Sequence, residues 1–383
     1  MKPWSDMKNS LKIVAINFLV LCGLLIAPAL LFAVYKHVKL SQAPLRPSED
    51  LRINPAYPTR LDQQKAKALS LDVENGFGDY QSFIGWRRNP FEGNYKNVLP
   101  DYNNRLSTNS SISQSSWFFG GSTMWGTGAV DSETIPSWYA SMSNSEVLNL
   151  GESAWVSRQS VNQLMNLFGD GHRPRLVVFY EGVNDVLHGC RSEHKNVPAH
   201  IQESAIASKL KQKPHDVLMQ SLVPLWNFVT APYKALGAKI GFKVSKHQSY
   251  GSMDCSSDPD KADRIASHLI NNWYSAYLLA RAHGAQFIGI LQPQVFSSSI
   301  RSDYLHPGDL YMESEYLAVY PIIKQKMKVA CAIDPVFCNY LVDGTTWLDG
   351  ADPVYIDFCH LTGSGNQIIA ENILQLDALS SFD

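Results

Sequence analysis

A serine that follows two glycines is the first residue whose type and surroundings suggest chemistry. The stretch FGGSTMWG (119–126) comes directly after a short apolar run. Glycines let the backbone turn sharply, so Ser122 is expected at the start of a helix, where backbone N–H groups can bind an anion. Taken alone, the motif is equally well explained by a glycine turn with a solvated hydroxyl.

An asparagine follows a later apolar run in the stretch EGVND (181–185). Gly182 permits a tight turn, and Asn184 can present a side-chain N–H₂ to the site. A preorganised amide donor that faces a developing oxyanion contributes roughly 3 kcal/mol of transition-state stabilisation. The alternative is an Asn-Asp turn that only caps a helix.

An aspartate and a histidine stand three residues apart in DFCHLTG (357–363), just before the last expected helix. Asp357 can reach back to His360, select its tautomer and stabilise its cation. The imidazole can then activate a serine hydroxyl as a general base. A lone D-x-x-H is weak evidence, because polar residues in surface loops produce it often.

Short apolar runs that alternate with helical patterns indicate how these groups are positioned. Four runs predict buried strands: Ser116–Phe119, Val147–Leu150, Leu176–Tyr180 and Gln286–Leu291. Helical patterns are found at Ile135–Met142, Arg158–Phe168, Lys261–His283, Leu310–Val329 and Gly363–Leu374. This alternation predicts a parallel sheet covered by helices on both faces, with the site at the carboxyl ends of its strands.

The order of the motifs resembles the SGNH (GDSL-like) hydrolase superfamily. Gly-Gly-Ser follows the first strand, Asn149-Leu150-Gly151 the second and Gly-x-Asn-Asp the third, and Asp-x-x-His precedes the last helix. The resemblance runs from about Trp117 to Leu374 without residues 188–260. It implies a flavodoxin-like three-layer α/β/α sandwich.

By position, the resemblance also implies a role for each residue of the site. Ser122 would be the nucleophile, His360 the base and Asp357 the residue that orients it. The oxyanion hole would consist of the backbone N–H groups of Ser122 and Gly151 and the side chain of Asn184. No cofactor and no metal ion are expected.

Three positions in and near these motifs need comment. Gly121 stands where the family has an aspartate, and Ala154 stands where many members have a second glycine after Gly151. Neither change removes a catalytic group. Cys359 is interpreted as a small packing residue, since Ser122 already occupies the glycine turn.

Length and composition limit the class of protein and its domains. The 383 residues are 45% hydrophobic and 18% charged, and 33 Lys+Arg against 35 Asp+Glu give a formal net charge of −2. This composition can bury a core and offers no concentrated basic surface for nucleic acid. We predict an N-terminal tail (1–12), a membrane anchor (13–34), a linker and strap (35–115) and the catalytic domain (116–383) with an insertion at about 188–260.

The anchor is predicted from Ile13–Val34, a run of 22 residues without a charge. About 20 apolar residues span a bilayer as a helix, whereas the apolar part of a cleaved signal peptide is about 7–15 residues long. The sequence therefore predicts a single-pass membrane protein with the lipid bilayer as a partner. Three lysines precede the span, and two lysines and an arginine follow it closely, so charge does not orient it.

The cysteines favour a domain outside the cytosol. Pairs Cys190–Cys255 and Cys331–Cys338 would leave Cys359 unpaired, and disulfides require an oxidising compartment. The prediction is a periplasmic or extracellular domain. Five reduced cysteines remain the alternative, because spacing does not prove connectivity.

Several other groups have a functional and a plain interpretation. The cluster His188, Cys190, His194 and His200 has no common zinc spacing, and metal is not expected there. Lys209–Lys213 is interpreted as a solvated face, with anionic lipid or glycan contact as the alternative. We expect core positions for Trp86, Trp273 and Trp347, with stacking on sugar rings as the alternative. The segment Val217–Leu236 is expected to form a lid or a helix pair that rests on a membrane.

The resemblance implies a serine esterase that acts through a covalent acyl-enzyme. By analogy with membrane-anchored relatives, we expect a small acyl ester, above all an O-acetyl group on a cell-envelope polysaccharide, so that an acylated glycan is the expected partner. An O-acetyltransferase with the same three residues is the first alternative. A catalytically inactive glycan-binding or scaffold protein is the second.

Overall fold

The structure of the protein is a computed structural model, which describes residues 4–42, 51–61, 63–70, 78–113, 115–211, 224, 226–231 and 252–380. The chain divides into two compact units. One comprises Met1–Leu45 and Ala205–Ser249, and the other comprises Arg46–Ser204 and Tyr250–Asp383. The strap segment therefore belongs to the same unit as the sheet.

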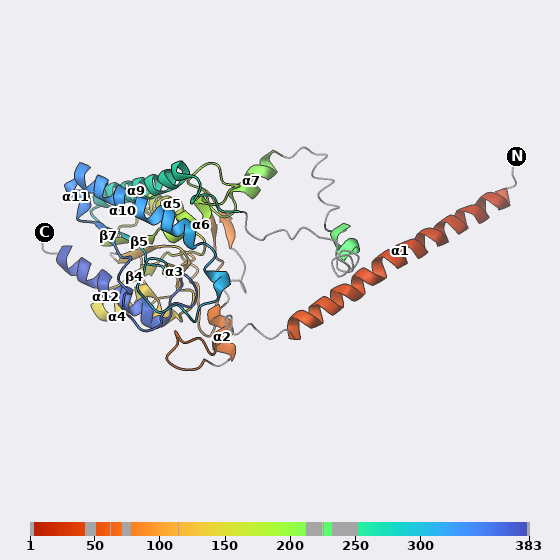
Figure 1. Cartoon of the computed structure of the whole chain (residues 1–383), viewed down its shortest axis with the longest axis horizontal. Coiled ribbons are helices and arrows are strands. Elements are labelled where there is room, and N and C mark those ends of the chain that lie inside the picture. The colour runs from red at the N-terminus through yellow and green to blue at the C-terminus, as the bar shows by residue number, and fades with distance from the viewer. Residues whose placement is uncertain are drawn as a thin grey trace. The chain divides into compact units, whose positions relative to one another are not determined.

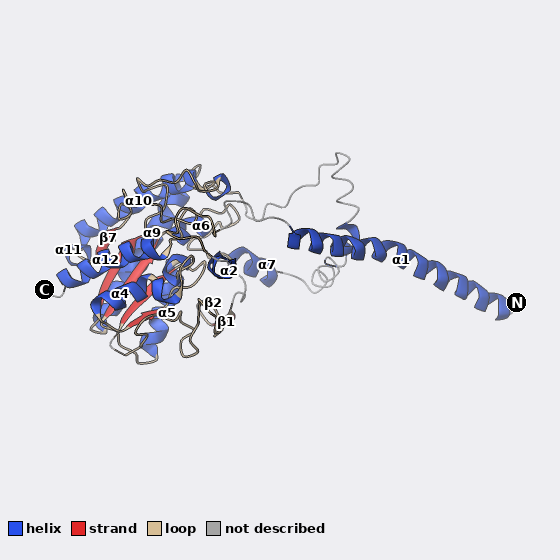
Figure 2. Cartoon of the chain, turned by 90° about the horizontal axis from the view of Figure 1, so that it is seen from below, coloured by secondary structure: helices blue, strands red, loops and turns tan. Residues whose placement is uncertain are grey.

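The second unit is built on a five-stranded parallel sheet (Figure 2). Its strands are β3 (Ser116–Gly120), β4 (Val147–Asn149), β5 (Leu176–Glu181), β6 (Gln286–Leu291) and β7 (Leu341–Asp343). Their order across the sheet is β4-β3-β5-β6-β7, which is the flavodoxin-like order 2-1-3-4-5. The predicted α/β fold with a parallel sheet is confirmed, and β7 is a fifth strand that the sequence did not predict.

Helices cover both faces of the sheet (Figure 1). Helices α5 (Ser157–Gly169), α9 (Pro259–Ala282) and α10 (Glu313–Ile333) pack on one face, and α4 (Ile135–Ser143) and α12 (Gly363–Ser380) pack on the other. Shorter helices are α2 (Gln63–Ser70), α3 (Ser122–Trp125), α6 (Val183–Gly189), α7 (Glu203–Leu210) and α11 (Pro335–Cys338).

Alternation of side chains along the strands separates two cores. On β3, Trp117 and Phe119 join the cluster under α5, α9 and α10, while Phe118 joins the cluster under α4 and α12. All five residues of β3 are buried. This is why the strand has a continuous apolar sequence and not an alternating one.

The strap begins with a small hairpin of β1 (Asp79–Gln81) and β2 (Gly85–Arg87). Ile84 and Trp86 pack with Trp155, which lies in the loop after β4. The strap therefore reaches the loops that surround the carboxyl ends of the strands.

The predicted membrane anchor is wrong. Residues 13–34 form part of helix α1 (Trp4–Gln42), as a span would, but no helix in the described part of the chain combines the length and the apolar character needed to cross a bilayer. The predicted single-pass membrane localisation falls with it.

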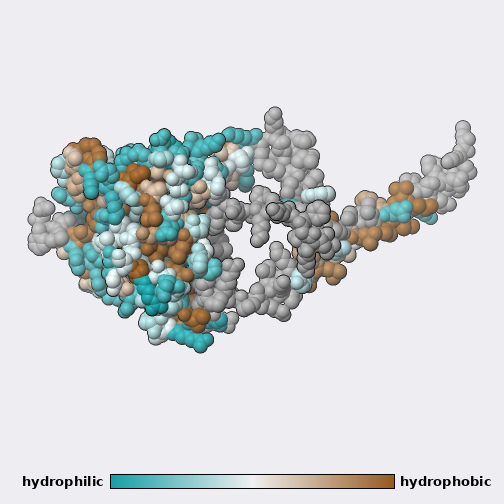
Figure 3. Space-filling view, in the orientation of Figure 1, coloured by the Kyte–Doolittle hydropathy of each residue, from teal (hydrophilic) through white to brown (hydrophobic). Residues whose placement is uncertain are grey.

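The surface of the second unit mixes polar and apolar side chains (Figure 3). A hydrophobic spot lies where Figure 1 labels α11, and Ile333 and Val336 are exposed there. The predicted lid or helix pair at 217–236 lies outside the described residues, apart from Pro224 and residues 226–231.

Candidate active site

Ser122 is the first residue of α3, which follows the inner strand β3 after Gly121. The backbone turns at Gly121, and a Cβ atom there would come within 2.2 Å of the Asn184 side-chain nitrogen. A side chain at position 121 would thus displace Asn184. This close approach requires glycine at position 121.

Ser122, His360 and Asp357 form a hydrogen-bonded chain. His360 Nε2 lies 2.6 Å from Ser122 Oγ, and His360 Nδ1 lies 2.6 Å from Asp357 Oδ2. The carboxylate can only accept, so Nδ1 carries the imidazole proton and Nε2 accepts from the serine hydroxyl. Residues 238 positions apart in the sequence are brought together in the geometry of a nucleophile, a base and an orienting acid.

The loop that carries Asp357 and His360 is held by bonds within itself. Asp357 Oδ1 accepts the backbone N–H groups of Cys359 (2.9 Å) and His360 (2.8 Å). The backbone N–H of Ile356 donates to the His360 carbonyl at 2.9 Å. The carboxylate is therefore fixed with its second oxygen facing the imidazole.

Burial and charge act in opposite directions on this pair. Burial lowers the pKa of His360, but the Asp357 carboxylate raises it more, so the pKa lies well above the ordinary value of 6.5. Burial raises the pKa of Asp357, but the charge and hydrogen bond of His360 bring it below its ordinary value. Ionised Asp357 is thus retained and stabilises a positive charge on the imidazole.

Asn184 lies in the first turn of α6, the helix that follows β5. Its Nδ2 donates to the Trp155 carbonyl at 2.8 Å. This bond fixes the orientation of the amide and leaves the second N–H available beside Gly121. The amide is therefore a preorganised donor next to the nucleophile.

Gly151 and Ala154 lie in the loop after β4 and differ in the hydrogen bonding of their backbone N–H groups. The N–H of Gly151 donates to Asn149 Oδ1 at 3.1 Å, and a Cβ atom at Gly151 would lie 2.4 Å from the Trp125 nitrogen. Gly151 is thus needed for close packing against α3. Its backbone N–H, which was predicted to bind the oxyanion, already donates to Asn149 in this structure. Ala154 has a left-handed φ of 62°, and among the described residues its N–H has no hydrogen-bond partner.

Two buried acids lie behind Asn184. Asp185 accepts from the backbone N–H (3.2 Å) and hydroxyl (2.6 Å) of Ser157, and burial raises its pKa to about 6. Burial and the neighbouring Asp185 raise the pKa of Glu181 to about 8, although Trp273 donates to it at 3.0 Å. The bonds of Asp185 join the start of α6 to the start of α5 and so position the asparagine.

Guanidinium groups of the strap enclose the helix that begins at Ser122. Arg88 and Arg105 both pack on the Trp125 ring, 3.8 Å and 4.3 Å from its centroid. Arg88 also pairs with Glu152 at 2.9 Å. Both cations are buried, so these contacts are stronger than at the surface.

Arg105 is the centre of this arrangement. It pairs with Asp131 at 2.6 Å and donates to the carbonyls of Trp125 (3.1 Å) and Ala129 (3.0 Å). The fork geometry of arginine allows all three bonds at once. The strap therefore fixes the chain on the carboxyl side of the nucleophile.

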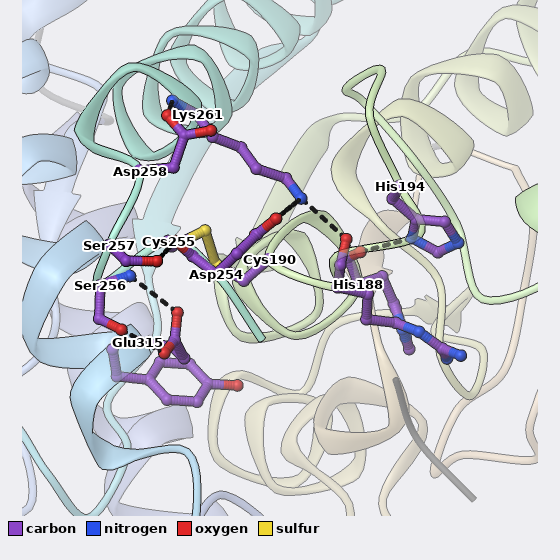
Figure 4. The surroundings of a disulfide bond; sticks show 12 residues. His188, Cys190, His194, Asp254, Cys255, Ser256, Ser257, Asp258, Lys261 and Glu315 are labelled. Carbon is purple, nitrogen blue, oxygen red and sulfur yellow. Dashed lines mark hydrogen bonds and ion pairs between the residues drawn. A yellow bond between two sulfur atoms is a disulfide. The ribbon is translucent and has the colours of Figure 1, made fainter. Parts of the chain in front are cut away.

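Both cysteine pairs considered from the sequence are joined in the structure. Cys190 and Cys255 form a disulfide between the end of α6 and the loop before α9, and Cys331 and Cys338 form one between α10 and α11. Figure 4 shows the Cys190–Cys255 disulfide with a polar contact on each side of it. One is the hydrogen bond of Ser256 to Glu315, and the other is the Lys261–Asp254 ion pair (2.8 Å). Cys359 takes part in neither bond, and its side chain is buried.

The histidines near this disulfide do not converge on a metal-binding group within the described chain. Burial lowers the pKa of His188 to about 3, and His194 Nδ1 contacts the His188 carbonyl at 2.6 Å (Figure 4). Trp86 and Trp273 are buried core residues.

The sequence reasoning missed the buried arginines of the strap and the pairing of Asp185 with Ser157. The strap was singled out for its aromatic residues, and a signal was present in the adjacent Arg87-Arg88 of the same stretch. Arginines in a segment expected to lie against a core need partners, because an unpaired buried charge is costly.

Several solved structures are similar to this chain. No protein-family model matches the sequence, and no curated protein matches it significantly. Similar solved structures include a lipolytic protein of the G-D-S-L family from Veillonella parvula (12% identity, TM-score 0.38), covering 68% of this chain and 95% of that one. A GDSL-like lipase from Bacteroides thetaiotaomicron has 14% identity and a TM-score of 0.36, with 70% and 89% covered.

A carbohydrate acetylesterase from Sinorhizobium meliloti is similar at 11% identity and a TM-score of 0.35, with 70% of this chain and 100% of that one covered. The first two structures are named for the GDSL family, which is the family that the sequence motifs resemble. At these TM-scores the likenesses carry no argument about activity or substrate. The function proposed next depends on the geometry of the site.

Proposed function

We propose that this protein is a serine hydrolase that cleaves small carboxylic esters through an acyl group on Ser122. The observation that carries the proposal is the chain of two 2.6 Å contacts from Ser122 Oγ through His360 to Asp357. A partly exposed serine in contact with an imidazole that is itself oriented by a carboxylate is an activated nucleophile.

In the first half of the reaction, Ser122 Oγ attacks the ester carbonyl carbon while His360 Nε2 takes the hydroxyl proton. Asp357 stabilises the imidazolium that forms. The tetrahedral intermediate collapses, and the imidazolium returns the proton to the leaving alcohol. In the second half, His360 activates a water, which attacks the acyl group and releases the acid and free Ser122.

The negative oxygen of the intermediate would be stabilised by the Asn184 amide and the backbone N–H of Ser122. Asn184 is fixed by Trp155, so it needs no reorganisation during the reaction. The N–H of Gly151 would be the third donor, and to serve in this role it would have to leave Asn149 Oδ1, to which it donates at 3.1 Å.

The substrate proposed is a small acyl ester, and an O-acetylated polysaccharide is the first to test. The placement of that glycan in the cell envelope depended on the membrane anchor and is not part of the proposal. An O-acetyltransferase would use the same groups with a sugar hydroxyl in place of water, and an inactive glycan-binding scaffold would use none of them.

The test compares the full chain with its Ser122→Ala variant on p-nitrophenyl acetate. Loss of the nucleophile is expected to lower the rate at least about 10³-fold. Ser141→Ala makes the same substitution at an exposed position on α4 and is expected to keep the parent rate. Equal rates for the parent and Ser122→Ala would exclude Ser122 as the nucleophile.

A fluorophosphonate separates the remaining alternatives. Mass analysis should find one adduct on Ser122 of the parent chain and none on the variant. An unlabelled parent would favour the scaffold. Acetylated sugar formed when a glycan acceptor is added would favour the transferase.

A further inference from the structure

Cys359 is a buried nucleophilic group that the proposed reaction does not use. Its side chain is 3% exposed, and burial raises the pKa of the thiol to about 11. Its sulfur lies 3.7 Å from His360 Nδ1, on the side of the ring that faces Asp357. The thiol is thus directed at the atom that controls the tautomer of the base.

Three donor atoms of different kinds converge at this point. One oxygen of Asp357, the sulfur of Cys359 and a ring nitrogen of His360 all lie within 4.8 Å of one another. Thiolate, imidazole and carboxylate are the protein ligands of zinc-like ions. Asp357 and His360 are partly exposed, so an ion with a remaining water ligand can approach.

The sulfur–nitrogen distance fits such an ion, and the oxygen–nitrogen distance would fit after a local movement. Tetrahedral bonds of about 2.0 Å to nitrogen and 2.3 Å to sulfur separate these two donors by about 3.6 Å. The observed sulfur–nitrogen distance is 3.7 Å. The oxygen and nitrogen, 2.6 Å apart, would have to separate by about 0.7 Å.

We propose that Asp357, Cys359 and His360 form an inhibitory site for a thiophilic divalent cation such as Zn²⁺ or Cd²⁺. The inference of inhibition rests on the proposed esterase function, whereas the binding site itself does not. An ion bound by Asp357 and His360 would occupy two groups that the proposed reaction uses, which is why the site would be inhibitory.

The chemistry of inhibition follows from the proton balance. The thiol loses its proton to solvent and forms the metal–sulfur bond. The imidazole proton moves through solvent from Nδ1 to Nε2, so Nδ1 is free to bind the ion. Nε2 then carries a proton and cannot accept the one from Ser122, which stops acylation.

Binding is tested first, with Cd²⁺ and the full chain in non-reducing buffer. All variants carry Cys22→Ser, so that Cys359 is the remaining thiol beside the two disulfides. The thiolate-to-cadmium charge-transfer band should appear in this parent and equally in its Ser122→Ala variant. It should be absent in Cys359→Ser and in Cys359→Ala.

Inhibition is tested with Zn²⁺, each variant being compared with its own metal-free rate. Replacement of Cys359 by serine or alanine should raise the inhibition constant at least about tenfold, since one of three ligands is lost. Mg²⁺, which prefers oxygen ligands, should not inhibit. Equal inhibition of the parent and both Cys359 variants would overturn the proposal, as would a parent that shows no cadmium band.

The two arms separate the two proposals. A cadmium band in a chain without esterase activity would leave the metal site standing and count against the proposed function. Serine-dependent hydrolysis in a chain without the band would do the reverse. A chain that binds Cd²⁺ through Cys359 but is not inhibited by Zn²⁺ would refute the inhibitory role.

Discussion

The two loops that meet in the site are held in different ways. The turn at Ser122 depends on distant residues, because strap arginines enclose Trp125 and the nearby glycines permit close backbone contacts. The loop of Asp357 and His360 is stabilised mainly by its own hydrogen bonds to Asp357 Oδ1. Substitutions in the strap should thus lower the stability of the fold around Ser122. Substitution of Asp357 should instead change the basicity of His360.

The largest effect is expected from Asp357→Asn. Asparagine keeps the Oδ1 acceptor for both backbone N–H groups, but it replaces the charged oxygen at Nδ1, so stability should change little and the rate should fall about 10⁴-fold. The rate of the parent should rise with pH through the pKa of His360, above 6.5, because only neutral imidazole is a base. Without the carboxylate that pKa falls, so the inflection should move to lower pH.

The measurement is a pH–rate profile of both proteins, with urea unfolding alongside. Asp352→Asn removes an exposed carboxylate from the same segment and should leave the inflection in place. An inflection that stays unchanged in Asp357→Asn would show that Asp357 does not control the base.

A large effect on stability is expected from Arg105→Lys. Lysine keeps the charge but cannot form the three bonds of the guanidinium fork, so the free energy of unfolding should fall by roughly 3 kcal/mol. The pH inflection of the folded fraction should remain that of the parent. This outcome would sharpen the contrast between the two loops.

Urea unfolding of Arg105→Lys is compared with that of Arg301→Lys. Arg301 makes an exposed pair with Asp303 at 2.7 Å, and such pairs contribute little. Similar losses of stability in both variants would mean that the strap does not support the nucleophile as inferred.

The smallest effect is expected from Ala154→Gly. Alanine is strained at a φ of 62°, and glycine is not, so the substitution should raise the free energy of unfolding by at most about 1 kcal/mol. The opposite sign is expected for Ala276→Gly inside α9, where glycine lowers helix stability. A destabilised Ala154→Gly would show that the loop needs the alanine side chain, which packs near Trp86 and Trp155.

The parts of the fold with strong local patterns were predictable. Four of the five strands are continuous apolar runs, and the order of the motifs along the chain placed Ser122, Asn184, Asp357 and His360 together. Strand β7 has three residues, none fully buried, so its sequence carries no strand signal. Its position depends on pairing with β6, which no local pattern reports.

Other features depend on contacts that a linear pattern cannot show. The occupation of the Gly151 N–H by Asn149 and the left-handed conformation of Ala154 are properties of a folded loop. Arg88 and Arg105, which pack on Trp125, belong to the segment 35–115, whose sequence suggested a polar linker and strap. The membrane anchor predicted for residues 13–34 is a further error, because no helix in the described part of the chain has the length and apolar character to cross a bilayer.

The disulfide Cys190–Cys255 has a consequence for how this protein can vary. It joins the two ends of a 65-residue segment, with their Cα atoms 5.1 Å apart. The chain therefore leaves the sheet and returns to it at one point, and closing a longer loop costs only about 0.6 kcal/mol for each doubling of its length. The part of this segment that belongs to the other unit, residues 205–249, can therefore change in length at little cost in loop closure while Asn184 stays in place.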